Sequence, residues 1–144
     1  LGVFLLLLAG LVWFFAPAGQ LTNGLKMGFL ISGLLIGMGG FSYLNFSADV
    51  LHNGSQLYEK GKTEFVKSEN ERMQKVEKGY PVYQMVFAIF ITLALAVIFF
   101  VNRPFWSGIS FAVIILFTGI MIVEAYSHKS IYCYAEELKV EIGK

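Results

Sequence analysis

The charged residues of this chain are confined to two stretches, and the long apolar runs outside them constrain the fold most strongly. Nearly all ionisable residues lie within 49–78 and 124–144, whereas only Lys26 and Arg103 lie near the apolar runs. The mean hydropathy is +0.65, and charged residues make up only 15% of the chain. A soluble core would interleave charges every few residues, so this pattern predicts an integral membrane protein.

Four apolar runs predict the spans of an all-α membrane protein, an up-down four-helix bundle built from two helical hairpins. Hairpin 1 covers residues 1–44, with spans at 1–16 and 25–44, and hairpin 2 covers residues 81–127, with spans at 82–101 and 105–123. The first run is short, because a bilayer core needs about 20 residues. A signal peptide is the less favoured alternative for it, since the Trp13–Phe14–Phe15 cluster followed by Pro17 is typical of a membrane interface.

The second helix has two pairs of glycines four residues apart, Gly24 with Gly28 and Gly33 with Gly37, and the third span has small residues at the same spacing. This spacing lets helix backbones approach closely in lipid, where there is no hydrophobic drive for helices to associate. The helix-packing candidates are Gly24, Gly28, Gly33, Gly37, Gly40, Ala88, Thr92 and Ala96. We favour packing within one chain, and a homodimer face is the alternative.

The polar stretch 45–80 predicts a cytoplasmic helical arm with a seam along one side. The seam positions are spaced 3-4-3-4-3, which is typical of a helix that lies against another helix. They are Val66, Glu69, Met73, Val76, Tyr80 and Tyr83. Either the segments 46–58 and 65–80 fold back on each other, around residues 53–55 or Gly61, or the seam docks a partner. The first five seam residues and Glu124, at the inner end of the fourth span, are therefore candidate docking residues.

Basic residues near the span ends predict that the arm and both termini are cytoplasmic. The arm has six basic residues and the tail at 128–144 has three, whereas the two opposite turns have one each. These residues are Lys60, Lys62, Lys67, Arg72, Lys75 and Lys78 in the arm, Lys129, Lys139 and Lys144 in the tail, and Lys26 and Arg103 in the turns. Within the tail, the stretch AEELKVEI predicts a short amphipathic helix.

The two hairpins resemble each other at an offset of about 84 residues. Both have a phenylalanine pair, a proline in the turn, a glycine that opens the second helix (Gly24 and Gly108) and a closing tyrosine (Tyr43 and Tyr126). A true repeat of two spans would be parallel, with its axis along the membrane normal. Chance similarity between two apolar hairpins is an equally favoured interpretation.

Three segments carry a resemblance to a known group of proteins. They are NERMQKVEKGYPVY at 70–83, RPFWSG at 103–108 and the Tyr134-x-x-x-Leu138 end of the last helix. Over residues 64–138 the chain resembles small four-span bacterial inner-membrane proteins of uncharacterised function. The resemblance implies the four-helix fold and the bacterial inner membrane, and it implies no activity.

The sequence contains no pattern typical of a catalytic, cofactor or metal site. Its spans lack ionisable residues, which argues against ion or proton coupling. Asp49 and His52 share a helix face at i, i+3, but two ligands are too few for a metal site. Cys133 is the single cysteine, which excludes an intrachain disulfide. The arm alternates basic and acidic residues, which argues against nucleic-acid binding.

The leading hypothesis is a non-catalytic accessory or scaffold subunit of a larger membrane complex, which docks through its cytoplasmic arm. Its expected partners are membrane lipids and either other membrane subunits or copies of itself. A small oligomeric transporter or channel is the first alternative, and a membrane immunity-type protective protein is the second. An enzyme is not expected.

Overall fold

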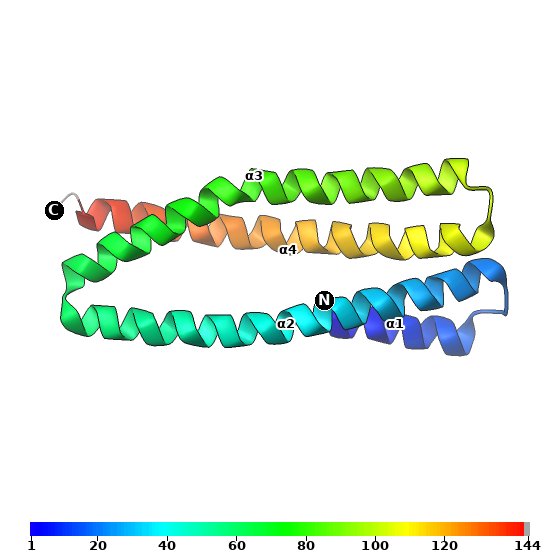
Figure 1. Cartoon of the computed structure of the whole chain (residues 1–144), viewed down its shortest axis with the longest axis horizontal. Coiled ribbons are helices and arrows are strands. Elements are labelled where there is room, and N and C mark those ends of the chain that lie inside the picture. The colour runs from blue at the N-terminus through cyan, green and yellow to red at the C-terminus, as the bar shows by residue number, and fades with distance from the viewer. Residues whose placement is uncertain (143–144) are drawn as a thin grey trace. The chain divides into compact units, whose positions relative to one another are not determined.

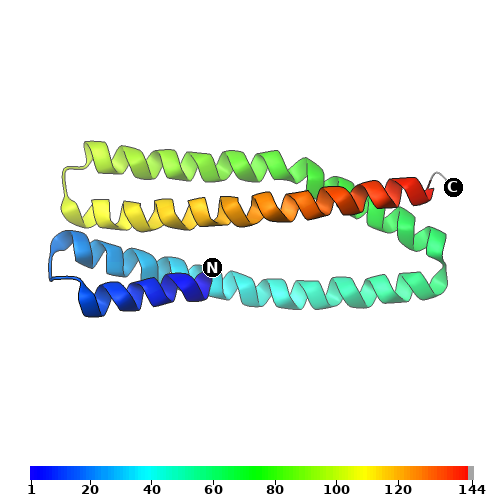
Figure 2. The ribbon, with the colours of Figure 1, turned by 180° about the vertical axis from the view of Figure 1, so that it is seen from behind.

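The protein is all-helical, as predicted, in the computed structural model (Figures 1 and 2). The structure describes residues 1–142, apart from the side chains at positions 60, 139, 141 and 142. The part of the chain it describes forms four helices, α1 (Gly2–Phe15), α2 (Gln20–Lys60), α3 (Lys62–Phe100) and α4 (Pro104–Ile142). The last two residues of the expected tail lie outside this description.

The last three helices are longer than the expected spans, with 41, 39 and 39 residues. They run without interruption through positions 44, 80 and 123, where composition changes and where we expected the second span, the arm and the fourth span to end. Helix hydrogen bonds are local, so a change from apolar to charged side chains does not end a helix. Pro81 also lies inside α3, although a proline in a helix interior removes a backbone hydrogen bond and usually kinks the helix.

The connections between the helices are short and contain the expected helix breakers. Ala16 ends α1 in an extended conformation (φ −89°, ψ 136°), which is favoured for a residue before proline. A single residue, Gly61, separates α2 from α3, and it was one of the two turns considered for the arm. Pro104 begins α4, where its missing N–H costs no helical hydrogen bond.

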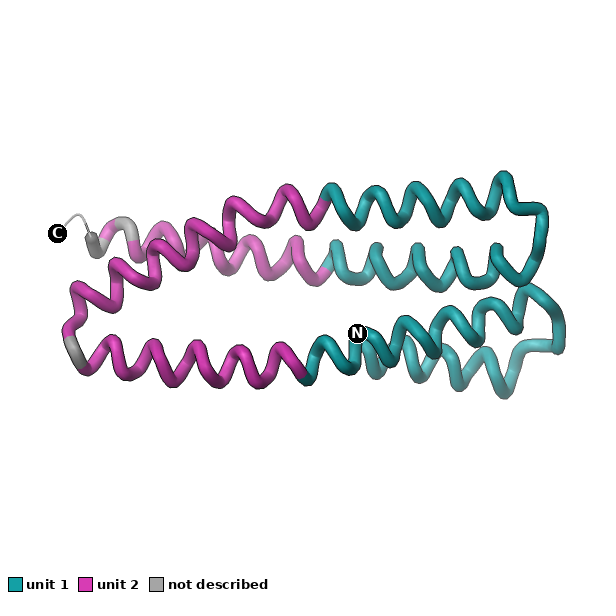
Figure 3. Tube along the Cα trace, viewed as in Figure 1, with its two compact units in different colours: residues 1–41, 85–122 teal, residues 42–84, 123–144 magenta. Residues whose placement is uncertain are grey.

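The chain divides into two compact units (Figure 3), and we call them the apolar unit and the polar unit. The apolar unit combines Leu1–Phe41 with Met85–Ile122, and the polar unit combines Ser42–Gln84 with Val123–Lys144. Lys26 and Arg103 are the only ionisable side chains of the apolar unit, and all 10 acidic residues belong to the polar unit. The division by contacts therefore coincides with the division by charge.

Three helices build the core of the apolar unit, while α3 lies at its edge. The buried core residues come from α1, α2 and α4; they are Leu5, Ala9, Phe29, Ala112 and Leu116. Of the three long helices, α3 has the least buried apolar part, and it contacts α4 through aromatic rings. Phe117 stacks on Phe90 with ring centroids 4.8 Å apart, and it lies 5.7 Å from Phe87.

Two glycines allow α2 and α4 to approach each other closely within the apolar unit. A methyl group on Gly24 would collide with the carbonyl oxygen of Phe105, and one on Gly108 would collide with the carbonyl oxygen of Leu21. Because Phe105 and Gly108 follow Leu21 and Gly24 by the same offset of 84, the contact is reciprocal. One turn further along, a methyl group on Gly28 would lie 2.6 Å from the Cβ atom of Ala112.

The remaining small residues of the predicted packing set fall into two groups. Gly33 lies against α1, where an added methyl group would come within 2.8 Å of the Leu6 side chain, and Gly37 lies beside Gly2. Gly40, Ala88 and Thr92 are exposed, and Ala96 is half-buried. The Thr92 hydroxyl donates a hydrogen bond to the Ala88 carbonyl oxygen at 2.8 Å, so its polar group is satisfied within α3.

The polar unit has a small core of its own, formed by α3 and the C-terminal part of α4. The buried residues are Val66, Met73, Ala135 and Leu138, with Phe65 and Ile131 packed against them. The seam of α3 therefore packs on the segment that we expected to be a separate tail helix. Residues 46–58, the other neighbour that we had considered, meet the start of α3 across the Gly61 connection, where the rings of Tyr58 and Phe65 lie edge to face, 5.6 Å apart.

Three of the four helices, α2, α3 and α4, are long and apolar enough to cross a membrane. The helix α1 is apolar but has only 14 residues, or about 21 Å at 1.5 Å per residue. We had expected four spans, and in the part of the chain that the structure describes three helices meet the length requirement. The fold is compatible with an integral membrane protein.

Candidate functional site: a tyrosine-lined cavity in the polar unit

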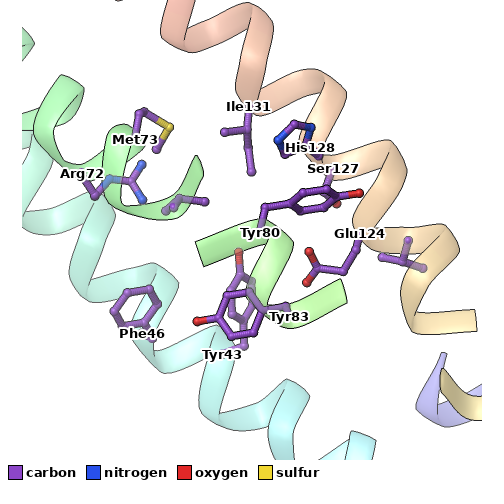
Figure 4. A pocket seen from close by; sticks show the side chains of 12 residues that line it. Tyr43, Phe46, Arg72, Met73, Tyr80, Tyr83, Glu124, Ser127, His128 and Ile131 are labelled. Carbon is purple, nitrogen blue, oxygen red and sulfur yellow. The ribbon is translucent and has the colours of Figure 1, made fainter. Parts of the chain in front are cut away.

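The polar unit contains a cavity of about 590 Å³ between α2, α3 and α4 (Figure 4). Ligand pockets usually have volumes of about 300–1,000 Å³ and mostly apolar walls with a few polar groups. The lining residues are Tyr43, Phe46, Arg72, Met73, Val76, Tyr80, Tyr83, Val123, Glu124, Ser127, His128 and Ile131. Three tyrosines, one carboxylate, one guanidinium and one imidazole therefore share one cavity with apolar side chains.

The ring of Tyr80 forms one wall of the cavity and is held there by His128. The two rings stack with centroids 3.9 Å apart and an interplanar angle of 27°. Tyr80 is half-buried, as is His128 on α4. Because each ring covers one face of the other, the stack fixes the orientation of Tyr80.

Glu124 points from α4 into the cavity, toward Tyr80 and Tyr83 (Figure 4). Its side chain is half-buried. Among the described residues, no ion pair or side-chain hydrogen bond involves Glu124. The carboxylate is therefore an uncompensated negative charge on the cavity wall.

Arg72 also lines the cavity, but its charge is matched by Glu69 one turn earlier on α3. Arg72 Nε donates to Glu69 Oε2 at 2.9 Å, and Nη2 donates to Oε1 at 2.5 Å. This two-point hydrogen bond raises the pKa of Arg72 above its ordinary value. Glu69, which interrupts the seam in the sequence, is thus accommodated by a partner on its own helix.

Burial raises the pKa of Tyr134, and the negative charge of Glu69 raises it further. Tyr134 belongs to a second, smaller cavity of about 210 Å³, whose other lining residues are Tyr58, Lys62, Phe65, Val66, Glu137 and Leu138. At its edge Tyr58 and Phe65 meet edge to face, 5.6 Å apart, across the Gly61 connection. Its volume of about 210 Å³ is below the range usual for ligand pockets, so we take the larger cavity as the candidate site.

The predicted docking residues fall into a packed part and a cavity part. Val66 and Met73 are buried in the core of the polar unit, and Glu69 is bound to Arg72. Val76, Tyr80 and Glu124 line the cavity together with Tyr83, the last residue of the seam. Met73 also lines the cavity, so four of the six seam residues reach the site, while Val66 and Glu69 do not.

An exposed apolar face on α2 was missed in the sequence. Leu44, Leu51 and Tyr58 follow each other at intervals of seven residues, with Ala48 and Ser55 between them, and all five side chains are exposed. Val50 and Leu57, about 100° around the helix from Leu51 and Tyr58, are half-buried. We call the five exposed residues, 44, 48, 51, 55 and 58, the α2 stripe. Its heptad spacing was the available signal, and the polar residues between its members concealed it.

The candidate metal ligands Asp49 and His52 lie on α2. Among the residues that it describes, no group of three or more histidine, cysteine, aspartate or glutamate side chains could hold a metal ion. Asp49 is exposed, and the His52 ring lies in hydrogen-bonding contact with Gln56 at 3.0 Å. Cys133 is an exposed free thiol.

The fold and the site thus define an all-helical protein with three helices able to cross a membrane and a cavity in its polar unit. No family model matches the chain, and neither the curated proteins nor the solved structures include a significant match.

Proposed function

We propose that this chain is a non-catalytic integral membrane protein that acts as an accessory or scaffold subunit of a larger membrane complex. The observation that carries the proposal is that the two units defined by contacts also differ in charge. The unit that contains only Lys26 and Arg103 as ionisable side chains suits a bilayer, and the unit with all the acidic residues suits water. Each of the three long helices contributes to both units.

In this proposal the apolar unit is an up-down bundle in the bacterial inner membrane, and the polar unit and both termini are cytoplasmic. The polar unit holds nine of the 11 basic residues and the opposite turns hold two, which supports that orientation. Near the opposite turn, the Lys26 ammonium lies 5.4 Å from the centre of the Trp13 ring. Tryptophan and lysine together are typical of the membrane–water interface.

The α2 stripe is the surface that supports docking best. The core of the polar unit already covers Val66 and Met73, so a partner that bound there would have to displace α4. Leu51, in contrast, is 72% exposed at the centre of the α2 stripe. Apolar residues at heptad spacing fit the seam of another helix, so the expected partner is a helical segment of a different membrane subunit.

Affinity purification of the full-length protein from native membranes in a mild detergent tests this role. We expect a stoichiometric companion with the wild-type chain and about tenfold less of it with Leu51→Asp, because a charge in the centre of an apolar interface is costly. The matched control is Asn53→Asp, which adds the same charge to an exposed position of α2 outside the stripe. It should retain the companion.

Two outcomes would contradict the proposal. A wild-type protein that purifies without any companion would remove the accessory role. If only copies of the same chain are recovered, the oligomeric channel becomes the better hypothesis, and ion flux in proteoliposomes would test it.

A further inference from the structure

We propose that the tyrosine-lined cavity binds an organic ammonium group that carries an apolar body, with Glu124 as its counter-charge. This site is separate from the docking role, because the α2 stripe contributes no residue to the cavity lining. The proposal rests on three properties of the cavity, which are its aromatic walls, its charge balance and its apolar end.

The aromatic walls come from α2 and α3. Tyr43 and Phe46 lie on α2, whereas Tyr80 and Tyr83 lie on α3. The faces of aromatic rings carry partial negative charge and attract alkylammonium ions, and cages of such rings recognise quaternary ammonium groups. The stack on His128 leaves one face of Tyr80 unoccupied by that ring.

The charge balance of the cavity favours a cation. The Arg72 guanidinium is paired with Glu69 by two hydrogen bonds, and one face of the His128 ring is covered by Tyr80. Glu124 remains as the one lining carboxylate, and within the described residues it has no cationic partner. An anionic ligand would face this carboxylate without a free guanidinium to offset it.

The rest of the lining indicates a ligand with an apolar body. Met73, Val76 and Ile131 lie in the part of the cavity next to the core of the polar unit. An ammonium group beside Glu124 could therefore extend an alkyl or aromatic portion along these side chains. Two sources share this chemistry, namely the headgroup of an ammonium phospholipid and a free cationic amphiphile.

Calorimetric titration of the full-length protein with benzyltrimethylammonium tests the site. The protein is held in dodecyl maltoside, which is uncharged and contains no amine. We expect saturable binding to the wild-type protein and about tenfold weaker binding to Glu124→Gln, which keeps the shape and removes the charge. Glu136→Gln is the matched control, because Glu136 is exposed on α4 and does not line this cavity.

Substitutions of tyrosines test if the aromatic ring of Tyr83 binds the probe. Tyr83→Phe should bind the probe about as well as the wild type, and Tyr83→Leu should bind it about fivefold more weakly, because only the former retains an aromatic face. Tyr126 is 76% exposed on the same unit and does not line the cavity. Tyr126→Leu should therefore leave the affinity unchanged.

The proposal is overturned if the wild-type protein shows no saturable binding at millimolar probe, or if Glu124→Gln or Tyr83→Leu binds the probe as tightly as the wild type. Thermal unfolding by circular dichroism identifies a variant that has lost its fold. If Glu124→Gln is such a variant, the comparison of Tyr83→Phe with Tyr83→Leu decides the test. Competition by added phosphatidylcholine, but not by phosphatidylglycerol, identifies a lipid headgroup as the source. Binding that neither lipid affects identifies a free cation.

Discussion

Single residues determine how closely α2 and α4 approach each other in the apolar unit. Gly24 and Gly108 each lie where an added methyl group would collide with a carbonyl oxygen of the other helix, so the backbones themselves are in contact. The sequence predicted small-residue packing, and the structure adds which neighbour each residue has. Ala88 and Thr92 have the same spacing but remain exposed, because spacing identifies a face and not its partner.

We expect Gly24→Ala and Gly108→Ala each to destabilise the protein by about 1–3 kcal/mol, the usual cost of overpacking a tight contact. Gly39→Ala is the control, since nothing lies within 4 Å of a methyl group there. Its better helix propensity should leave stability unchanged or slightly higher. Thermal unfolding in detergent, followed by circular dichroism, measures the difference. Equal unfolding temperatures for all three variants would contradict the close approach.

At the scale of elements, the sequence predicted helices well and their ends poorly. It identified the apolar runs and offered Gly61 as one of two possible turns, but it placed boundaries at 44, 80 and 123, where only the side chains change. The seam was visible from its spacing, whereas its partner was not, since α3 and the C-terminal part of α4 are far apart in sequence. The cavity was missed for the same reason, because its walls come from three helices.

The packed part of the seam predicts a difference between two neighbouring positions on α3. Met73 is 4% exposed in the core of the polar unit, and Val76 is 38% exposed at the cavity. Met73→Ala should destabilise the polar unit by about 2–3 kcal/mol, and Val76→Ala should cost less than about 1 kcal/mol. Hydrogen exchange at the amides of residues 62–80 reports on this unit. Equal protection in both variants would show that the seam is not packed against α4.

For the whole molecule, the proposed orientation can be tested with its single cysteine. Cys133 lies in the polar unit and is exposed, so a membrane-impermeant maleimide should label it only after spheroplasts are lysed. A variant with Cys133→Ser and Asn102→Cys should be labelled in intact spheroplasts, because position 102 lies in the exposed α3–α4 turn. Labelling of Cys133 in intact cells would reverse the orientation.

The reciprocal contact around Gly24 and Gly108 has a consequence for how the bundle assembles. Two separate hairpins that met in this way would form a dimer with a self-complementary interface, and their association would depend on their concentration in the membrane. Here both surfaces belong to one chain, so the association is intramolecular and independent of expression level. Because the two surfaces belong to one chain, they need not have the same residues at equivalent positions. Gly28, for example, faces Ala112.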